Sequence, residues 1–181
     1  IGEATFYGPK LDVQLRTVLG KEESIATNQL DFISAQRFGL EFTNERGEKE
    51  VPVIIHRAIM GSFDRFFAFY LEHTAGDFPL WLSPVQAVIV PIADRHLEYA
   101  QEIARQMKAA KLRVEIDDRS ERMNAKIRDA ELQKIPLILV VGDKEQEGGT
   151  VNARLRQVKE QRTLKVEELI REMQERVRER K

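Results

Sequence analysis

The sequence has 181 residues, of which 42% are hydrophobic and 33% charged, with a formal net charge of −1 and no cysteine. This composition excludes a disordered chain and leaves room for one ordinary domain or two small ones. No apolar run approaches the ~20 residues that span a bilayer, and no signal peptide is visible. Without cysteine the chain offers no thiolate metal site or thiol nucleophile, and we expect a cytoplasmic location with no membrane partner.

The first half of the sequence predicts an antiparallel sheet with one helix. Four segments have strand-like apolar patterns, and short turns such as the Asn-Glu-Arg-Gly sequence at residues 44–47 separate them. Consecutive strands joined by short turns pair antiparallel. We expect these strands at residues 11–18, 25–32, 38–42 and 51–55. A helix from Phe63 to about His73, with aromatic residues at helical spacing, is expected to cover one face of the sheet.

The second half predicts an α/β fold. Two of its apolar segments are continuous, as in strands buried on both faces, and the alternation of strands with helices requires a parallel core sheet with right-handed crossovers. We expect strands at residues 85–92, 112–116, 137–141, 150–156 and 162–164, and helices at 95–110, 120–133 (with Ser120 as N-cap) and 166–178. Residues 142–149 are expected to form a polar loop.

A connector punctuated by glycine and proline separates the two halves at residues 75–84. We therefore expect a domain boundary near Ser83 and Pro84. This boundary gives an incomplete first domain over residues 1–83 and a second domain over residues 84–181.

The start of the first-half helix carries a candidate anion-binding residue. Ser62 is a good N-cap, and Gly61 allows a ligand or another backbone segment to come close. A cation such as Arg65 in the first turn opposes the helix dipole, and an anion beside the free N–H groups would balance that charge. Arg65 could equally pair with Asp64 or Glu72 on a solvated face, and the residues alone leave both readings open.

The sequence HRAIMGSFDRF at residues 56–66 resembles motif 3 of the class II aminoacyl-tRNA synthetases, and the threonyl enzymes in particular. In that family the motif 3 arginine binds the terminal phosphate of ATP, which is bound with Mg²⁺, and the resemblance implies this role for Arg65. The histidine is one of three protein zinc ligands in the threonyl enzymes, which implies a metal-binding role for His56.

A lone histidine at a strand end is more often structural than a ligand, and His73 and His96 lack ligand spacing to His56. In the family that the chain resembles, the remaining zinc ligands lie upstream of Ile1. We therefore expect zinc in the full-length enzyme but not in this chain alone.

Two further motifs carry the same resemblance. The sequence FYGPK at residues 6–10 resembles a threonyl-enzyme motif, which implies that Tyr7 contacts the amino-acid substrate. Lys10 would then act near the reactive phosphates or the tRNA end. The segment 27–32, TNQLDF, resembles the family's T-x-Q-L-D-F strand, which implies that Gln29 faces the active site. A buried glutamine can also simply satisfy neighbouring backbone groups.

The second half resembles the anticodon-binding domain of class II synthetases. The loop sequence Gly-Asp-Lys-Glu follows an apolar strand, and carboxyl ends of parallel strands are where such sheets bind ligands. The resemblance implies anticodon contacts by Glu145 and Arg154. Ser120 and Lys134 occupy two other base-reading positions, where the family pattern has asparagine and arginine. Lysine cannot form the bidentate contact of arginine.

The C-terminal segment from Thr150 to Lys181 is basic, with ten Lys or Arg against six Asp or Glu, a net charge of +4. Such charges usually lie on solvated helix faces, but they can also face a phosphate backbone. We expect phosphate contacts from Arg156, Lys159 or Arg162.

The resemblance covers essentially the whole chain. It implies an α+β first part, a partial class II antiparallel sheet with the motif 3 helix. A three-layer α/β/α anticodon-binding domain with a mixed, mainly parallel sheet follows.

The implied activity is that of a threonine–tRNA ligase, a homodimer that activates threonine with ATP and charges threonine tRNA. Motifs 1 and 2 are missing, and we expect no aminoacylation by this chain alone. The alternative is a non-catalytic nucleic-acid or protein-binding module built on the same domain.

Overall fold

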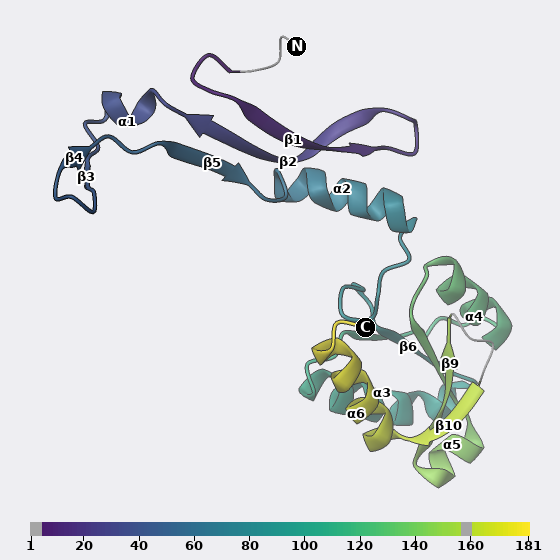
Figure 1. The fold of residues 1–181 in the computed structure, drawn as a ribbon. Helices are drawn as coiled ribbons and strands as arrows, with labels where there is room; N and C mark the ends of the chain where they lie inside the picture. Colours follow the sequence, from purple (N-terminus) through teal and green to yellow (C-terminus); the bar gives the residue numbers. More distant parts are fainter. Residues whose placement is uncertain (1–4, 157–160) are drawn as a thin grey trace. The chain divides into compact units, whose positions relative to one another are not determined.

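The computed structural model describes residues 5–156 and 161–181, and the chain divides into two compact units, Ile1–Gly76 and Asp77–Lys181 (Figure 1). The sequence predicted a boundary near Ser83 and Pro84, but the connector packs with the second unit. Phe78 and Leu80 are buried, and Leu80 belongs to the main core cluster of that unit. Apolar side chains in the connector therefore move the division seven residues towards the N-terminus, from 83/84 to 76/77.

The first unit is built on a three-stranded antiparallel sheet of order β1-β2-β5, as expected from the alternating patterns. Its strands are β1 (Lys10–Arg16), β2 (Glu22–Asp31) and β5 (Ile54–Ala58). A separate two-stranded hairpin joins β3 (Phe42–Thr43) to β4 (Lys49–Glu50) around the predicted turn.

The prediction of a strand at residues 38–42 is wrong, because a short helix, α1 (Ser34–Arg37), follows β2. The Asp31 carboxylate accepts hydrogen bonds from the backbone N–H groups of Ile33 (2.9 Å) and Ser34 (2.8 Å). Such local side-chain bonds favour turns and helix starts over strands. The chain therefore leaves the sheet at Asp31, and only β5 returns to it.

Helix α2 (Phe63–Thr74) begins at Ser62, whose side chain accepts a hydrogen bond from the Arg65 backbone N–H (3.3 Å), so the predicted N-cap is confirmed. The expectation that this helix covers a face of the sheet is wrong. No residue of α2 is buried, and Leu11 and Ile55, on one face of the sheet, stay 60% and 63% exposed.

The second unit contains a five-stranded mixed sheet of order β10-β9-β8-β6-β7. Strands β7, β6 and β8 run parallel, β9 is antiparallel to β8, and β10 is antiparallel to β9. Within the described residues, β9 alone therefore opposes the direction of the other four strands. Their bounds are Ala87–Pro91 for β6, Val114–Ile116 for β7, Leu137–Val141 for β8, Thr150–Leu155 for β9 and Gln161–Lys165 for β10.

Helices cover both faces of this sheet, which confirms the predicted three layers (Figure 1). Helices α3 (Leu97–Ala109) and α6 (Val166–Arg178) pack on one face, where Ile89, Leu139 and Val151 meet Ile103 and Leu169. Helix α4 (Met123–Leu132) packs on the other face against Val88, Val90, Ile138 and Val140. Alternate residues of β6 and β8 thus enter two different cores, as their continuous apolar sequences predicted.

Two local expectations in this unit are wrong. Residues predicted as a polar loop form a short helix, α5 (Asp143–Gly148), and the Glu145 carboxylate accepts a hydrogen bond from the backbone N–H of Gly142 (3.0 Å). Helix α4 begins after Arg122 rather than at Ser120, and it has no side-chain cap. Within the described residues, no helix is long and apolar enough to cross a membrane.

Candidate functional sites

Three of the residues singled out from separate motifs meet in one row across the first sheet. Lys10 on β1 lies opposite Gln29 on β2, and Gln29 lies opposite His56 on β5. Residues directly opposite on neighbouring strands share a face of the sheet. The sheet register therefore brings the three motifs together into a single polar cluster.

Tyr7 joins this row from the segment that precedes β1. Its backbone carbonyl accepts a hydrogen bond from the N–H of Phe32 (3.0 Å), and its hydroxyl donates to Oε1 of Gln29 (2.8 Å). A Cβ on Gly8 would lie 2.1 Å from the backbone oxygen of Leu30, so only glycine fits there. The glycine thus holds the tyrosine beside Gln29. The amide group of Gln29 is oriented by this side chain rather than by a backbone group.

A buried carboxylate orients His56. Asp31 accepts hydrogen bonds from the backbone N–H and hydroxyl of Ser34 and lies 2.9 Å from Nε2 of His56. These donors, His56 first among them, hold the pKa of Asp31 well below its usual range. Because the ionised carboxylate only accepts, Nε2 must donate to it, and in a neutral imidazole the lone pair is then on Nδ1.

His56 alone does not make a metal site. A catalytic zinc ion needs three protein ligands. Within the residues that the structure describes, no group of three His, Cys, Asp or Glu side chains is placed to hold a metal ion. The described residues therefore do not fit a zinc ion by themselves.

A second carboxylate, Asp12, extends the row by one position. It pairs with the ammonium group of Lys10 (2.7 Å), and Thr27 donates a hydrogen bond to it. The hydrogen bond from Lys10, followed by that from Thr27, lowers the pKa of Asp12. The side chain of Lys10 is therefore held along the sheet next to Gln29.

The sequence reasoning did not single out Asp12 and Asp31 as members of this cluster. The available signal was the period of two on β2, which puts Thr27, Gln29 and Asp31 on one face. The sequence cannot give the register that brings Asp12 beside Thr27.

Arg65 lies in the first turn of α2 and is exposed. Its guanidinium makes no ion pair or hydrogen bond with any described residue, whereas Glu72 accepts a hydrogen bond from the backbone N–H of Val18 (3.2 Å). The pairing with Asp64 or Glu72 that the sequence left open is not found in the described part of the chain. Gly61, at φ +61°, lets the helix start approach the carbonyl of Ile25.

In the second unit the loop before β9 is held by a charged network. Arg95 donates two hydrogen bonds to Asp143 (2.9 and 2.7 Å), and Nε2 of the buried His96 lies 2.9 Å from the same carboxylate. These contacts, Arg95 first, hold the pKa of Asp143 well below its usual range. The network fixes the start of α5. One oxygen of Glu145 caps this helix and the other remains available as an acceptor.

Arg154 lies on β9 opposite Ile138 of β8, and hence on the face that α4 partly covers. It is half-buried, and its Nε is buried without a hydrogen-bond partner among the described residues. Buried polar atoms in folded proteins are normally hydrogen-bonded, so a buried Nε without a partner is unusual.

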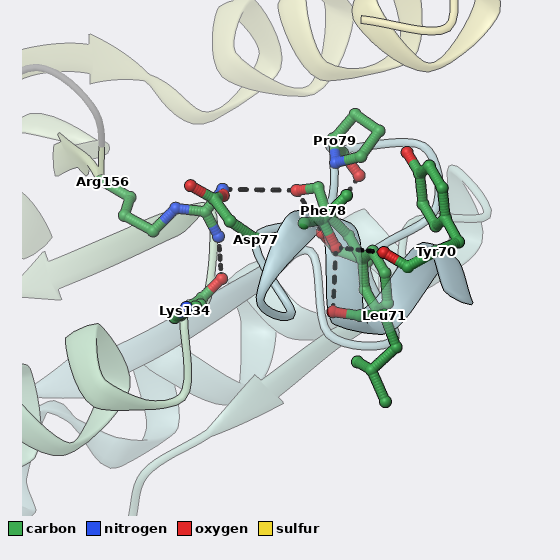
Figure 2. A network of polar contacts seen from close by, with 9 residues as sticks. Tyr70, Leu71, Asp77, Phe78, Pro79, Lys134 and Arg156 are labelled. Atoms are coloured by element: carbon green, nitrogen blue, oxygen red, sulfur yellow. Dashed lines mark hydrogen bonds and ion pairs between the residues drawn. The ribbon is translucent and has the colours of Figure 1, made fainter. Parts of the chain in front are cut away.

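Two other basic residues of this unit already have partners. Arg156 bonds to the carboxylate of Asp77 and the carbonyl of Lys134 through its terminal nitrogens (Figure 2), although its Nε, like that of Arg154, is buried without a partner among the described residues. Arg162 lies on the opposite face of the sheet from Arg154 and pairs with Glu172 of α6 (3.1 Å). Lys159, which was also expected to contact phosphate, lies outside the described residues.

The four expected anticodon residues do not form one compact pocket. Ser120 lines a cavity of about 270 Å³ between the loops that follow β6 and β7, at the carboxyl ends of the parallel strands. Lys134 precedes β8 at its amino end, in a left-handed conformation with φ +57°. Glu145 follows β8, and Arg154 lies opposite Ile138, near the amino end of that strand. The four residues are therefore distributed along the sheet.

Family models match both units. A model described as "Anticodon binding domain" matches residues 86–176, and one described as "tRNA synthetase class II core domain (G, H, P, S and T)" matches residues 2–74. The chain belongs to the class II aminoacyl-tRNA synthetases.

Among the class II synthetases, similar curated proteins are threonine–tRNA ligases. The sequence is 52% identical over 169 residues to the enzyme of Acidobacterium capsulatum, covering 93% of this chain and 25% of the relative. It is 51% identical over 178 residues to that of Deinococcus radiodurans, covering 97% of this chain and 27% of the relative. The chain spans about a quarter of the length of these threonine–tRNA ligases.

A solved structure has the same fold as this chain. The RNA binding domain of threonyl-tRNA synthetase from Cryptosporidium parvum Iowa II matches with a TM-score of 0.85 and 36% identity. The match covers 96% of this chain and 44% of that chain. Sequence and structure thus confirm the threonyl resemblance and the fold that it implied.

Proposed function

We propose that the chain is part of a threonine–tRNA ligase whose second unit reads the anticodon of threonine tRNA. The observation that carries this proposal is the half-buried guanidinium of Arg154, whose Nε has no partner among the described residues. The terminal nitrogens of this guanidinium, for which the structure gives no hydrogen bond to a described residue, can donate to the acceptor atoms of a base. Glu145 complements it, because its remaining oxygen can accept from a base amine or ring N–H.

The first unit contributes to the site that activates threonine with ATP. Tyr7 and Gln29, joined by their hydrogen bond, contact the amino acid. Arg65, which has no partner in the described part of the chain, and Lys10 neutralise phosphate charge. Class II activation is an in-line attack on the α-phosphate, and such groups act by positioning and by electrostatic stabilisation.

A non-catalytic binding module has no need of this polar cluster. The row from Lys10 to His56 and the Tyr7 contact to Gln29 therefore favour an enzyme. The proposal includes the homodimer implied by the family resemblance. It also includes the expectation that residues 1–181 alone do not aminoacylate tRNA.

Binding of RNA loops to the whole chain tests the proposal. Fluorescence anisotropy would compare two anticodon stem-loops, one from threonine tRNA and one that differs only in its anticodon. Wild-type protein should prefer the cognate loop, and Glu145→Ala and Arg154→Ala should each narrow that preference by roughly 1–3 kcal/mol. Arg162→Ala is the matched control, because this arginine lies on the other face and pairs with Glu172. Equal affinity of the wild-type chain for both loops would contradict anticodon reading.

A further inference from the structure

The antiparallel pair β9 and β10 has one apolar and one polar face. On the side of α3 and α6, Val151, Ala153 and Leu164 join the main core. The residues between them point to the opposite face, because side chains alternate along a strand. That face carries the pair Thr150 and Lys165, whose ammonium group donates to the carbonyl of Gly148 (3.0 Å), and beyond this pair Asn152, Arg154, Gln161 and Thr163.

The strand register arranges these four residues as two cross-strand pairs. Arg154 lies opposite Gln161, and Asn152 lies opposite Thr163. The two pairs are two residues apart along each strand, which corresponds to about 6.6 Å. They form a small rectangular group of polar side chains, called here the β9–β10 polar group.

The polar group has no partners within the described part of the chain. The structure gives no side-chain hydrogen bond from Asn152, Gln161 or Thr163 to any residue that it describes, and the Nε of Arg154 is buried and unpaired. Gln161 and Thr163 are exposed, and the apolar cluster under α4 includes no residue of β9 or β10. On the other face of β10, by contrast, Arg162 is already paired with Glu172. The polar group is thus the part of this strand pair that is left to meet a ligand.

The chemistry of the group fits the edges of nucleobases. It contains two carboxamides, a hydroxyl and a guanidinium, with no carboxylate to repel phosphate and no aromatic ring for stacking. Carboxamides and guanidinium groups form the bidentate contacts that distinguish bases. Stacked bases are 3.4 Å apart along a strand. The spacing of about 6.6 Å between the two pairs therefore suits bases that are unstacked, as in an RNA loop.

We propose that the β9–β10 polar group contacts two neighbouring unstacked bases of an RNA loop. Asn152 and Gln161 are the additional residues that determine which bases are accepted. Arg154 with Gln161 contacts one base, and Asn152 with Thr163 contacts the next. This inference rests on the proposed function, in which the second unit binds the anticodon loop of a tRNA.

The test uses the whole chain and a set of threonine anticodon stem-loops with single base replacements at each loop position. The informative variants are Gln161→Met, which keeps the side-chain length, and Asn152→Ala. The matched control is Gln101→Met, because Gln101 is exposed on α3, which packs on the opposite face of the sheet. Thermal unfolding of each variant checks that the fold is retained.

We expect Gln161→Met to lower the preference for the native base at one loop position. Asn152→Ala should do so at the adjacent position, each by about 5- to 10-fold. Gln101→Met should bind as the wild type does. The inference is overturned if both variants keep the wild-type preference at every position while Arg154→Ala loses it. A wild-type chain without base preference at any position would overturn the proposed function as well.

Discussion

The two units of the chain are stabilised in different ways. Among the described residues, Ala35 is the one hydrophobic residue of the first unit that is buried, whereas the second unit buries apolar side chains on both faces of its sheet. The first unit instead contains a hydrogen-bonded polar cluster with Asp31 at its centre. A sheet can thus arrange site residues by strand register alone, whereas most of the stability must come from the burial of apolar side chains.

The largest expected effect comes from core truncation. Ile103 is fully buried between α3 and the sheet, so Ile103→Ala should destabilise the second unit by about 2–5 kcal/mol. The matched change in the first unit, Ile55→Ala, removes a side chain that is already 63% exposed and should cost less than about 0.5 kcal/mol. Hydrogen exchange resolved by residue measures both effects. Equal losses in the two units would refute the contrast.

The connector provides a sharper test of where the second unit begins. A polypeptide of residues 77–181 should unfold cooperatively in urea when followed by far-UV circular dichroism, a probe that residues 84–181 also provide. Removing residues 77–83 deletes the buried Leu80 and the ion pair from Asp77 to Arg156. Loss of the Leu80 burial alone should cost about 1.5–3 kcal/mol. If residues 84–181 proved as stable in urea as residues 77–181, the boundary predicted from the sequence would be the correct one.

A smaller effect is expected from pH. Because its folded-state pKa is lowered, Asp143 contributes stability that is fully present above its unfolded pKa of about 3.9 and is lost as the pH falls below that value. Asp143→Asn should therefore show a shallower loss of stability than the wild type below about pH 4. Acid unfolding followed by circular dichroism compares the two proteins. Parallel curves would show that the contacts with Arg95 and His96 do not contribute.

The sequence predicted best the elements that tertiary packing and local pattern both favour. The apolar segment 137–141 and the helix at 166–178 match β8 and α6, because their patterns reflect burial in this fold. Two other predictions were wrong because side-chain hydrogen bonds to the backbone start helices there. Asp31 starts α1 where a strand was expected, and Glu145 caps α5 where a loop was expected.

The candidate sites, too, could be predicted only in part from the sequence. Motif resemblance named Tyr7, Gln29 and His56 separately, but only the strand register shows that they lie together. The orientation of the His56 ring depends on Asp31, and the sequence carries no sign of that contact. Likewise, the Nε of Arg154 has no partner among the described residues because no neighbouring strand places an acceptor beside it. No local sequence pattern shows this.

The central claim is that the second unit folds by itself and reads RNA through the face that carries Arg154. The most direct measurement is the ratio of affinities for cognate and non-cognate anticodon stem-loops, determined for the whole chain and for residues 77–181 at one salt concentration. The account predicts the same ratio for both, well above one. A ratio near one for residues 77–181, with cooperative unfolding retained, would contradict it.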